Sequence, residues 1–100
     1  MKVTIQAIHF KAADRLKAYI QEKVDKLPQF FDRILSAEVT LKVQNEHKGE
    51  NKYMEITVQV PGQTLVASEN AATFEAATDI VTDKMKAQLR KYKGKLKTHV

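Results

Sequence analysis

The spacing of hydrophobic residues along this chain switches between two periods, and the order of the switches restricts the fold. From Val3 to Ile8 apolar and polar residues alternate, and a period of two predicts a strand with one buried face. From about Ala13 the period lengthens, and apolar residues recur every three or four positions at Leu16, Ile20, Val24 and Leu27. That spacing predicts an amphipathic helix. Pro28 should perturb the end of this helix, with Phe30 and Phe31 packing just beyond it.

Alternation then returns for two more strands, and a turn signal predicts a third. Residues 38–44 and 54–60 each alternate apolar and polar side chains, and the polar residues 45–52 between them indicate an exposed loop. Pro61 and Gly62 follow the second of these strands in the order that a type II turn requires. A hairpin into a strand over 64–68 is therefore expected.

The remainder of the chain predicts a second, long helix. Asn70 is the expected N-cap, and the two alanines that follow it favour helix. One apolar stripe then runs along the helix: Phe74, Val81, Met85, Leu89, Tyr92 and Leu96.

The order strand, helix, three strands, helix predicts an α+β fold of the type β-α-β-β-β-α. Each helix has one apolar stripe and each strand one apolar face, so the simplest packing places both helices on one face of a four-stranded sheet. The opposite face carries polar residues that can remain hydrated: Thr4, Gln6, Thr40, Lys42, Gln44, Thr57 and Gln59. At 100 residues the chain is expected to form a single domain over residues 1–100.

Positive charge is concentrated at the C-terminal end. The formal net charge is +5, yet residues 83–100 contain seven basic residues against one acidic, whereas residues 1–82 contain ten against eleven. Such an asymmetry indicates a polyanionic partner, either nucleic acid, an acidic membrane surface or an acidic protein.

On a helical projection the basic residues form two rows that flank the apolar stripe. One row holds Lys84, Lys91 and Lys95, and the other holds Lys86, Arg90, Lys93 and Lys97. The first helix adds a basic and aromatic row of its own: Arg15, Tyr19, Lys23, Lys26 and Phe30. If both helices lie on the same side of the sheet, these rows can merge into one cationic surface. The alternative is a merely solvated helix face, which Glu22 and Asp25 favour for the first helix.

The sequence argues against catalysis and against cofactor or metal binding. There is no cysteine, and His9, His47 and His99 are far apart in the chain. No metal-binding histidine pair, nucleophile elbow or glycine-rich phosphate loop is present. No apolar run approaches the ~18 residues that a membrane span needs. We therefore expect a cytoplasmic binding protein, not an enzyme, without cofactor, metal, membrane or small-molecule substrate.

The chain also resembles a known family. The run TFEAATDIVTDKMKAQLRKYK at residues 73–93 resembles the second helix of the ribosome hibernation promoting factors, the protein Y family, and ten positions fall in register: Phe74, Ala76, Ala77, Asp79, Asp83, Lys84, Gln88, Leu89, Lys91 and Lys93. Residues 15–34 resemble the first helix of that family, with Lys23, Lys26 and Leu27 in its K-x-x-K-L pattern. Residues 39–43 and 65–69 resemble two of its strands.

The resemblance implies the same β-α-β-β-β-α fold, similar to double-stranded RNA-binding domains. It also implies a factor that binds the small ribosomal subunit through its rRNA, occupies the mRNA and tRNA decoding channel, and inhibits translation in stress or stationary phase. The length is similar to that of the short form, so pairing of ribosomes would need a second protein factor. The expected RNA-binding residues are Lys84, Lys86, Arg90, Lys91, Lys93, Lys95 and Lys97, joined by Lys23 and Lys26.

Three positions depart from the family pattern. Ala87 stands where the family usually has a basic residue, so one RNA contact is lost unless Lys86 or Arg90 replaces it. Ala7, Ile8 and His9 stand where the first strand typically ends in Gly and polar or basic residues. Ala13 replaces the usual Ser or Thr at the start of the first helix, which removes a cap worth ~1 kcal/mol.

Two alternative functions stay open. One is a basic amphipathic helix that binds an acidic membrane or an acidic protein. The other is a generic double-stranded RNA binder, which would have equal affinity for any duplex of sufficient length.

Overall fold

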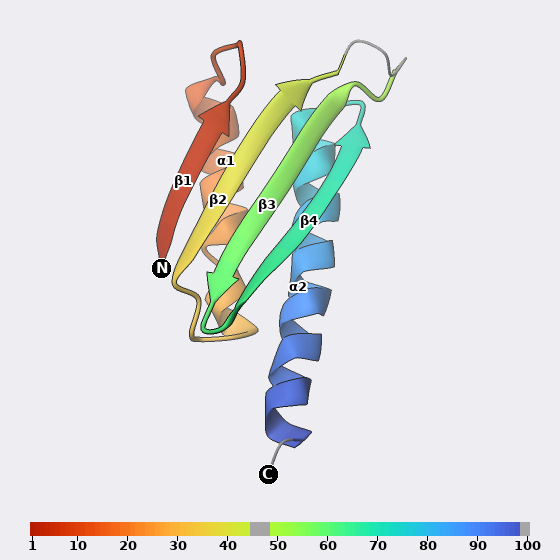
Figure 1. Cartoon of the computed structure of the whole chain (residues 1–100). Helices are drawn as coiled ribbons and strands as arrows, with labels where there is room; N and C mark the ends of the chain where they lie inside the picture. Colours follow the sequence, from red (N-terminus) through yellow and green to blue (C-terminus); the bar gives the residue numbers. More distant parts are fainter. Residues whose placement is uncertain (45–48, 99–100) are drawn as a thin grey trace.

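The computed structural model describes residues 1–44 and 49–98, and its element order is the predicted β-α-β-β-β-α (Figure 1). The elements are β1 (Lys2–Ala7), α1 (Asp14–Val24), the short 3-10 helix η1 (Leu27–Gln29), β2 (Ser36–Val43), β3 (Lys52–Val60), β4 (Gln63–Ala71) and α2 (Phe74–Thr98). The predicted loop over 45–52 lies partly outside the described residues, and its last residue, Lys52, begins β3.

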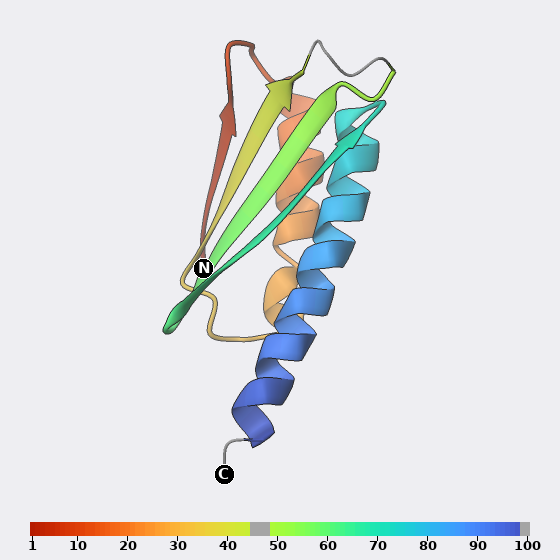
Figure 2. The same cartoon turned by 45° about the vertical axis from the view of Figure 1, so that its right-hand side comes forward.

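The four strands form one sheet in the order β1-β2-β3-β4. β1 and β2 are parallel, and the other two pairs are antiparallel. A parallel pair cannot be joined by a tight turn, which is why α1 crosses between β1 and β2. Both helices lie on the same face of the sheet (Figure 2), as the sequence predicts.

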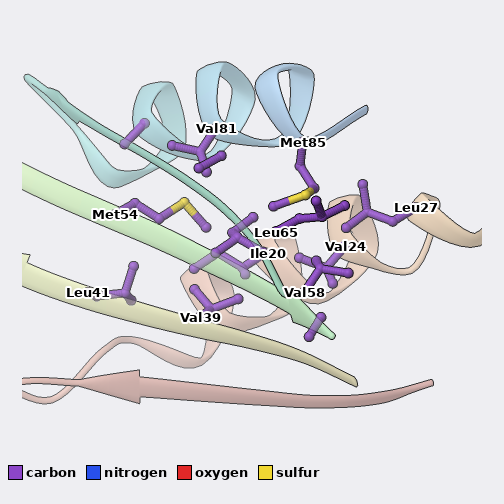
Figure 3. Close-up of a cluster of buried hydrophobic side chains, with 14 of the residues drawn as sticks. Ile20, Val24, Leu27, Val39, Leu41, Met54, Val58, Leu65, Val81 and Met85 are labelled. Atoms are coloured by element: carbon purple, nitrogen blue, oxygen red, sulfur yellow. The ribbon is translucent and has the colours of Figure 1, made fainter. Parts of the chain in front are cut away.

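The core fills the space between the helices and the sheet (Figure 3). The whole stripe predicted for the first helix is buried: Leu16, Ile20, Val24 and Leu27. These side chains meet the alternate residues of the central strands, among them Val39 and Val58. Regular α-helix ends at Val24, and Pro28 lies in η1, which keeps Leu27 inside the core.

The start of the second helix differs from the prediction. Asn70 is not the N-cap; it belongs to β4, opposite Tyr53, and its side-chain amide donates to Gln44 Oε1 at 2.7 Å. β4 is therefore longer than the predicted 64–68. Thr73 caps α2 instead, since its Oγ1 accepts a hydrogen bond from the Ala76 N–H at 3.0 Å.

The end of the second helix differs as well. Val81, Met85 and Leu89 are fully buried, but Leu96 is 45% exposed, so it does not belong to the core. The reason is geometric, because α2 continues past the end of the sheet and its last turns have no strand beneath them (Figures 1 and 2). Among the described residues, no helix has both the length and the apolar character that crossing a membrane would require.

Candidate nucleic-acid interface

α2 is fastened to the edge of the sheet by three side chains spaced four residues apart. Lys84 Nζ donates to the Ser68 carbonyl at 3.1 Å, Gln88 Nε2 to the Val66 carbonyl at 2.7 Å, and the Tyr92 hydroxyl to the Pro61 carbonyl at 2.7 Å. Four helical residues rise about 6 Å, which is close to the roughly 6.8 Å between alternate residues of a strand. This match lets Lys84 and Gln88 reach alternate carbonyls of β4, whereas Tyr92 reaches Pro61 in the turn that precedes β4. We call these three contacts the edge ladder.

The first basic row of α2 lies on this β4 side. Lys84 also forms an ion pair with Glu69 at 3.0 Å. The hydrogen bond from Lys84, the Asn70 N–H and the charge of Lys84 hold the pKa of the Glu69 carboxyl below its usual range. Farther along, Lys91 and Lys95 line a hollow of about 320 Å³ together with Gln63 and Leu65 of β4.

The second basic row faces the segment that follows α1. The Lys86 ammonium and the Arg90 guanidinium lie over the same ring, that of Phe30, at 5.5 and 4.8 Å from its centroid. Phe30 is half-buried and packs against the core. Phe30 therefore fixes the direction of two cations that would otherwise move freely on an exposed helix face.

The basic row of the first helix meets α2, but a carboxylate stands between them. Asp79 accepts a hydrogen bond from the Tyr19 hydroxyl at 2.5 Å and pairs with Lys23 at 3.5 Å. The hydrogen bond to Asp79 raises the pKa of Tyr19, and the Tyr19 oxygen and then the Asp79 carboxylate raise the pKa of Lys23. Asp83 similarly lies 3.8 Å from Lys86. These carboxylates offset part of the positive charge between the helices.

Beyond Asp83 the sequence contains no acidic residue. Lys91 and Lys93 are exposed and form no ion pair with any residue in the ranges 1–44 and 49–98. Arg90 is exposed as well, and Lys95 lies one turn after Lys91 on the rim of the same hollow. Most of the net positive charge of the protein is thus displayed by the last turns of α2, and we call residues 90–96 the basic tip.

The predicted site residues therefore fall into two groups. Lys23, Lys84 and Lys86 pair with carboxylates. Arg90, Lys91, Lys93 and Lys95 belong to the basic tip, where Arg90 also lies over the Phe30 ring. Lys26 is exposed on the turn after α1, and Lys97 lies in α2. The role of all nine residues in RNA binding stays a prediction.

Sequence reasoning missed the contacts that orient these residues. The aromatic row did indicate Phe30, but nothing in the sequence shows that two cations of α2 share its ring. Gln88 was expected only as a position that matches the family pattern, and Tyr92 only as an apolar residue of the stripe. In the structure both side chains anchor the helix by hydrogen bonds to backbone carbonyls. Of the three histidines only His9 falls in the described residues, among which no cluster of acidic or histidine side chains could hold a metal ion.

Comparisons with known proteins agree with this architecture. The family model described as "Sigma 54 modulation protein / S30EA ribosomal protein" matches residues 3–97. The chain is 35% identical over 95 residues to a ribosome hibernation promoting factor of Pseudomonas putida, covering 95% of this chain and 89% of that protein.

Two solved structures share the fold. The N-terminal domain of Thermus thermophilus protein Y superposes with a TM-score of 0.77 at 25% identity, covering 92% of this chain and 99% of that one. A ribosomal subunit interface protein from Coxiella burnetii superposes with a TM-score of 0.83 at 20% identity, covering 94% and 99%.

Proposed function

Because this chain belongs to the sigma 54 modulation protein / S30EA ribosomal protein family, we propose that it binds the small ribosomal subunit through its rRNA, occupies the decoding channel and thereby inhibits translation. The family match and the relative named ribosome hibernation promoting factor support a ribosome-associated function in hibernation. In this proposal the protein performs no chemistry of its own. Its position on the subunit excludes mRNA and tRNA.

The observation that carries the proposal is the basic tip. Four exposed cations stand on the last turns of a rigid helix with no carboxylate after Asp83. Proteins recognise folded RNA largely through shape and phosphate contacts, which require a rigid cationic surface and not base-reading loops. The tip suits this task, since α2 is held at its base by the core and by the edge ladder.

The burial of the apolar face of α2 argues against the membrane alternative. Its apolar face is already buried against β3 and β4, so the same face is not available to a lipid surface. Leu96 alone adds an exposed large apolar side chain to the described part of the basic tip. One leucine gives far too little apolar area for stable interfacial binding.

Co-sedimentation with isolated ribosomal subunits tests the proposal, using two variants that each remove two positive charges. The variant Lys91→Ala with Lys93→Ala changes the tip, and Lys2→Ala with Lys17→Ala is the matched control at exposed positions on β1 and α1. Each lost phosphate contact should reduce the salt slope of binding by roughly 0.7–0.9, so the tip variant should flatten it by about 1.5. The control should keep the slope of the unchanged protein.

Inhibition of cell-free translation should weaken in parallel with binding. No association of the unchanged protein with the small subunit at low salt would sink the proposal. Binding to anionic liposomes without binding to ribosomes would favour the membrane alternative, and equal affinity for any RNA duplex would favour a generic duplex binder.

A further inference from the structure

A second cavity lies at the other end of the molecule from the basic tip. Ile8, His9 and Phe10, which follow β1, line it together with Lys42 and Val43 at the end of β2. In Figure 1 these strand ends are at the top, whereas the C-terminus of α2 is at the bottom. The cavity has a volume of about 390 Å³, which is within the usual range of small-ligand sites. The basic tip and the edge ladder use none of its residues.

The apolar part of this cavity is preformed. The Phe10 ring is stacked on Phe74, with the ring centroids 5.3 Å apart and the planes 8° from parallel. Phe74 is itself buried in the core, so the position of Phe10 is fixed. Beside it, Val43 is 41% exposed although it lies at a position whose side chain alternates toward the helices. A fixed aromatic ring with neighbouring aliphatic side chains is a surface on which a nucleobase can stack.

The polar part consists of Lys42 and His9, both exposed. His9 has a φ of +61°, and within the described residues it is the one position other than glycine with a positive φ. A bulky side chain in this region of the backbone costs of order 1–3 kcal/mol and tends to persist at functional sites. The imidazole of His9 and the ammonium group of Lys42 thus both line the cavity.

We propose that this cavity binds one unpaired nucleotide of the RNA. The base stacks on Phe10 between Ile8 and Val43, and the phosphate is bound by Lys42 and His9. A nucleotide joins a flat base to an anionic phosphate, and the cavity joins an aromatic ring to two basic side chains. A simple anion would use only the basic side chains, and an aliphatic chain only the ring. The choice of RNA rests on the proposed function, but the existence of a nucleotide site does not. The protein would then hold its RNA at both ends of a molecule 48 Å long.

An amide NMR titration of the full chain with adenosine 5′-monophosphate tests the site. Saturable shifts are expected at Ile8, His9, Phe10, Lys42 and Val43. Ribose 5-phosphate and inorganic phosphate serve as probes without a base, and both should bind at least about fivefold more weakly, because stacking of a base on an aromatic side chain contributes ~1–3 kcal/mol. Equal affinity for ribose 5-phosphate would overturn the proposal in favour of a simple anion site, and shifts confined to α2 would overturn it too.

Two variants separate a binding role from a structural one. Lys42→Gln keeps a polar side chain that is one atom shorter and removes its charge, so it should reduce nucleotide affinity by at least about tenfold, because a hydrogen bond to a charged group contributes ~1.5–3 kcal/mol. His9→Gly removes the imidazole and relieves the strained φ, so the unfolding midpoint should rise while nucleotide affinity falls. A purely structural His9 would not move these two readouts in opposite directions. Unchanged nucleotide affinity in both variants would overturn the proposal.

Subunit co-sedimentation of the same variants keeps this inference distinguishable from the proposed function. If the unchanged protein binds mononucleotides but no ribosomal subunit, the proposed function fails and the nucleotide site stands. If it binds the small subunit but no mononucleotide, the nucleotide site fails and the proposed function stands.

Discussion

At the scale of single residues, Phe30 carries more of the candidate interface than its half-buried position suggests. Its ring lies under both Lys86, which is half-buried, and Arg90, which is exposed, so it orients two cations at once. Each such contact is worth ~0.5–1 kcal/mol at an exposed site. A change at Phe30 should therefore affect binding through residues that it does not itself remove.

We expect Phe30→Leu to weaken binding to the small subunit about threefold to tenfold, because both cation–π contacts are lost. The unfolding free energy should fall by no more than about 2 kcal/mol, since leucine retains most of the apolar packing. Phe30→Tyr keeps the aromatic face and is the control, with affinity unchanged. Equilibrium binding and urea unfolding measure the two effects, and equal affinities of the two variants would show that the ring does not orient the cations.

The helix caps give a second test at residue scale. Thr73→Ala removes the side-chain cap of α2 and should cost ~1 kcal/mol, whereas Thr73→Asp should preserve stability. Ala13 is the N-cap of α1, with the extended backbone of an N-cap but no side-chain hydrogen bond. Ala13→Asp should therefore stabilise the protein by about 0.5–2 kcal/mol. Urea unfolding checks all three, and a loss of stability in Ala13→Asp would contradict the cap geometry.

At the scale of elements, the two ends of α2 have different roles. Its first turns bury Val81, Met85 and Leu89 against the sheet, and its last turns form the basic tip. The apolar stripe continues to Leu96 in the sequence without any sign of where the sheet stops. Stability and charge are thus separated along one helix.

A matched pair of leucines makes this separation measurable. Leu89→Ala should lower the unfolding free energy by about 2–5 kcal/mol, because a fully buried side chain leaves a cavity. Leu96→Ala should change it by less than about 0.5 kcal/mol, because that side chain is exposed. Thermal or urea unfolding measures both, and a large loss in Leu96→Ala would mean that the tip packs against the rest of the chain.

The sequence predicts the elements better than their ends. Hydrophobic periodicity indicates three strands and both helices, because each of these elements has one buried face whose period is local. The Pro61–Gly62 turn indicates the fourth strand. The start of α2 could not be read this way, since Asn70 and Thr73 are both good caps. Only the pairing of β3 with β4, which places Asn70 opposite Tyr53, decides between them.

The positions of the positive charges in the candidate site were predictable from the sequence, but their carboxylate partners were not. The row of Lys and Arg in α2 is visible in the sequence, and its division into two rows follows from helical geometry. Which cations are offset depends on residues far away in the chain, such as Glu69 for Lys84 and the Asp79 partner of Lys23. The positive φ of His9 also depends on the path from β1 to α1 and has no sequence signal.

At the scale of the whole molecule, the charge distribution makes the protein strongly asymmetric. The remainder of the chain is close to neutral, and the excess charge lies at one end of a body measuring 48 × 24 × 18 Å. Such an arrangement orients the protein as it approaches a polyanion and accelerates productive encounters.

The association rate with small subunits should therefore fall at least about tenfold between 50 and 200 mM salt, with a smaller change in the dissociation rate. Because the chain has no cysteine, Ala18→Cys on the exposed side of α1 provides a single site for a fluorescent dye. Stopped-flow mixing then measures both rates. The tip variant Lys91→Ala with Lys93→Ala should show a weaker salt dependence of the association rate, and a salt effect confined to dissociation would contradict steering.

The edge ladder has a consequence for self-assembly. An outer strand normally offers free carbonyls on which another chain can add a strand, and repeated addition produces filaments. In β4 the carbonyls of Val66 and Ser68 are already occupied by Gln88 and Lys84 of α2. Strand addition is therefore hindered along this part of β4, and β1 is the more open edge of the sheet. Pairing β1 with β1 uses the same surface on each copy, so the assembly closes at two and cannot propagate into a fibril.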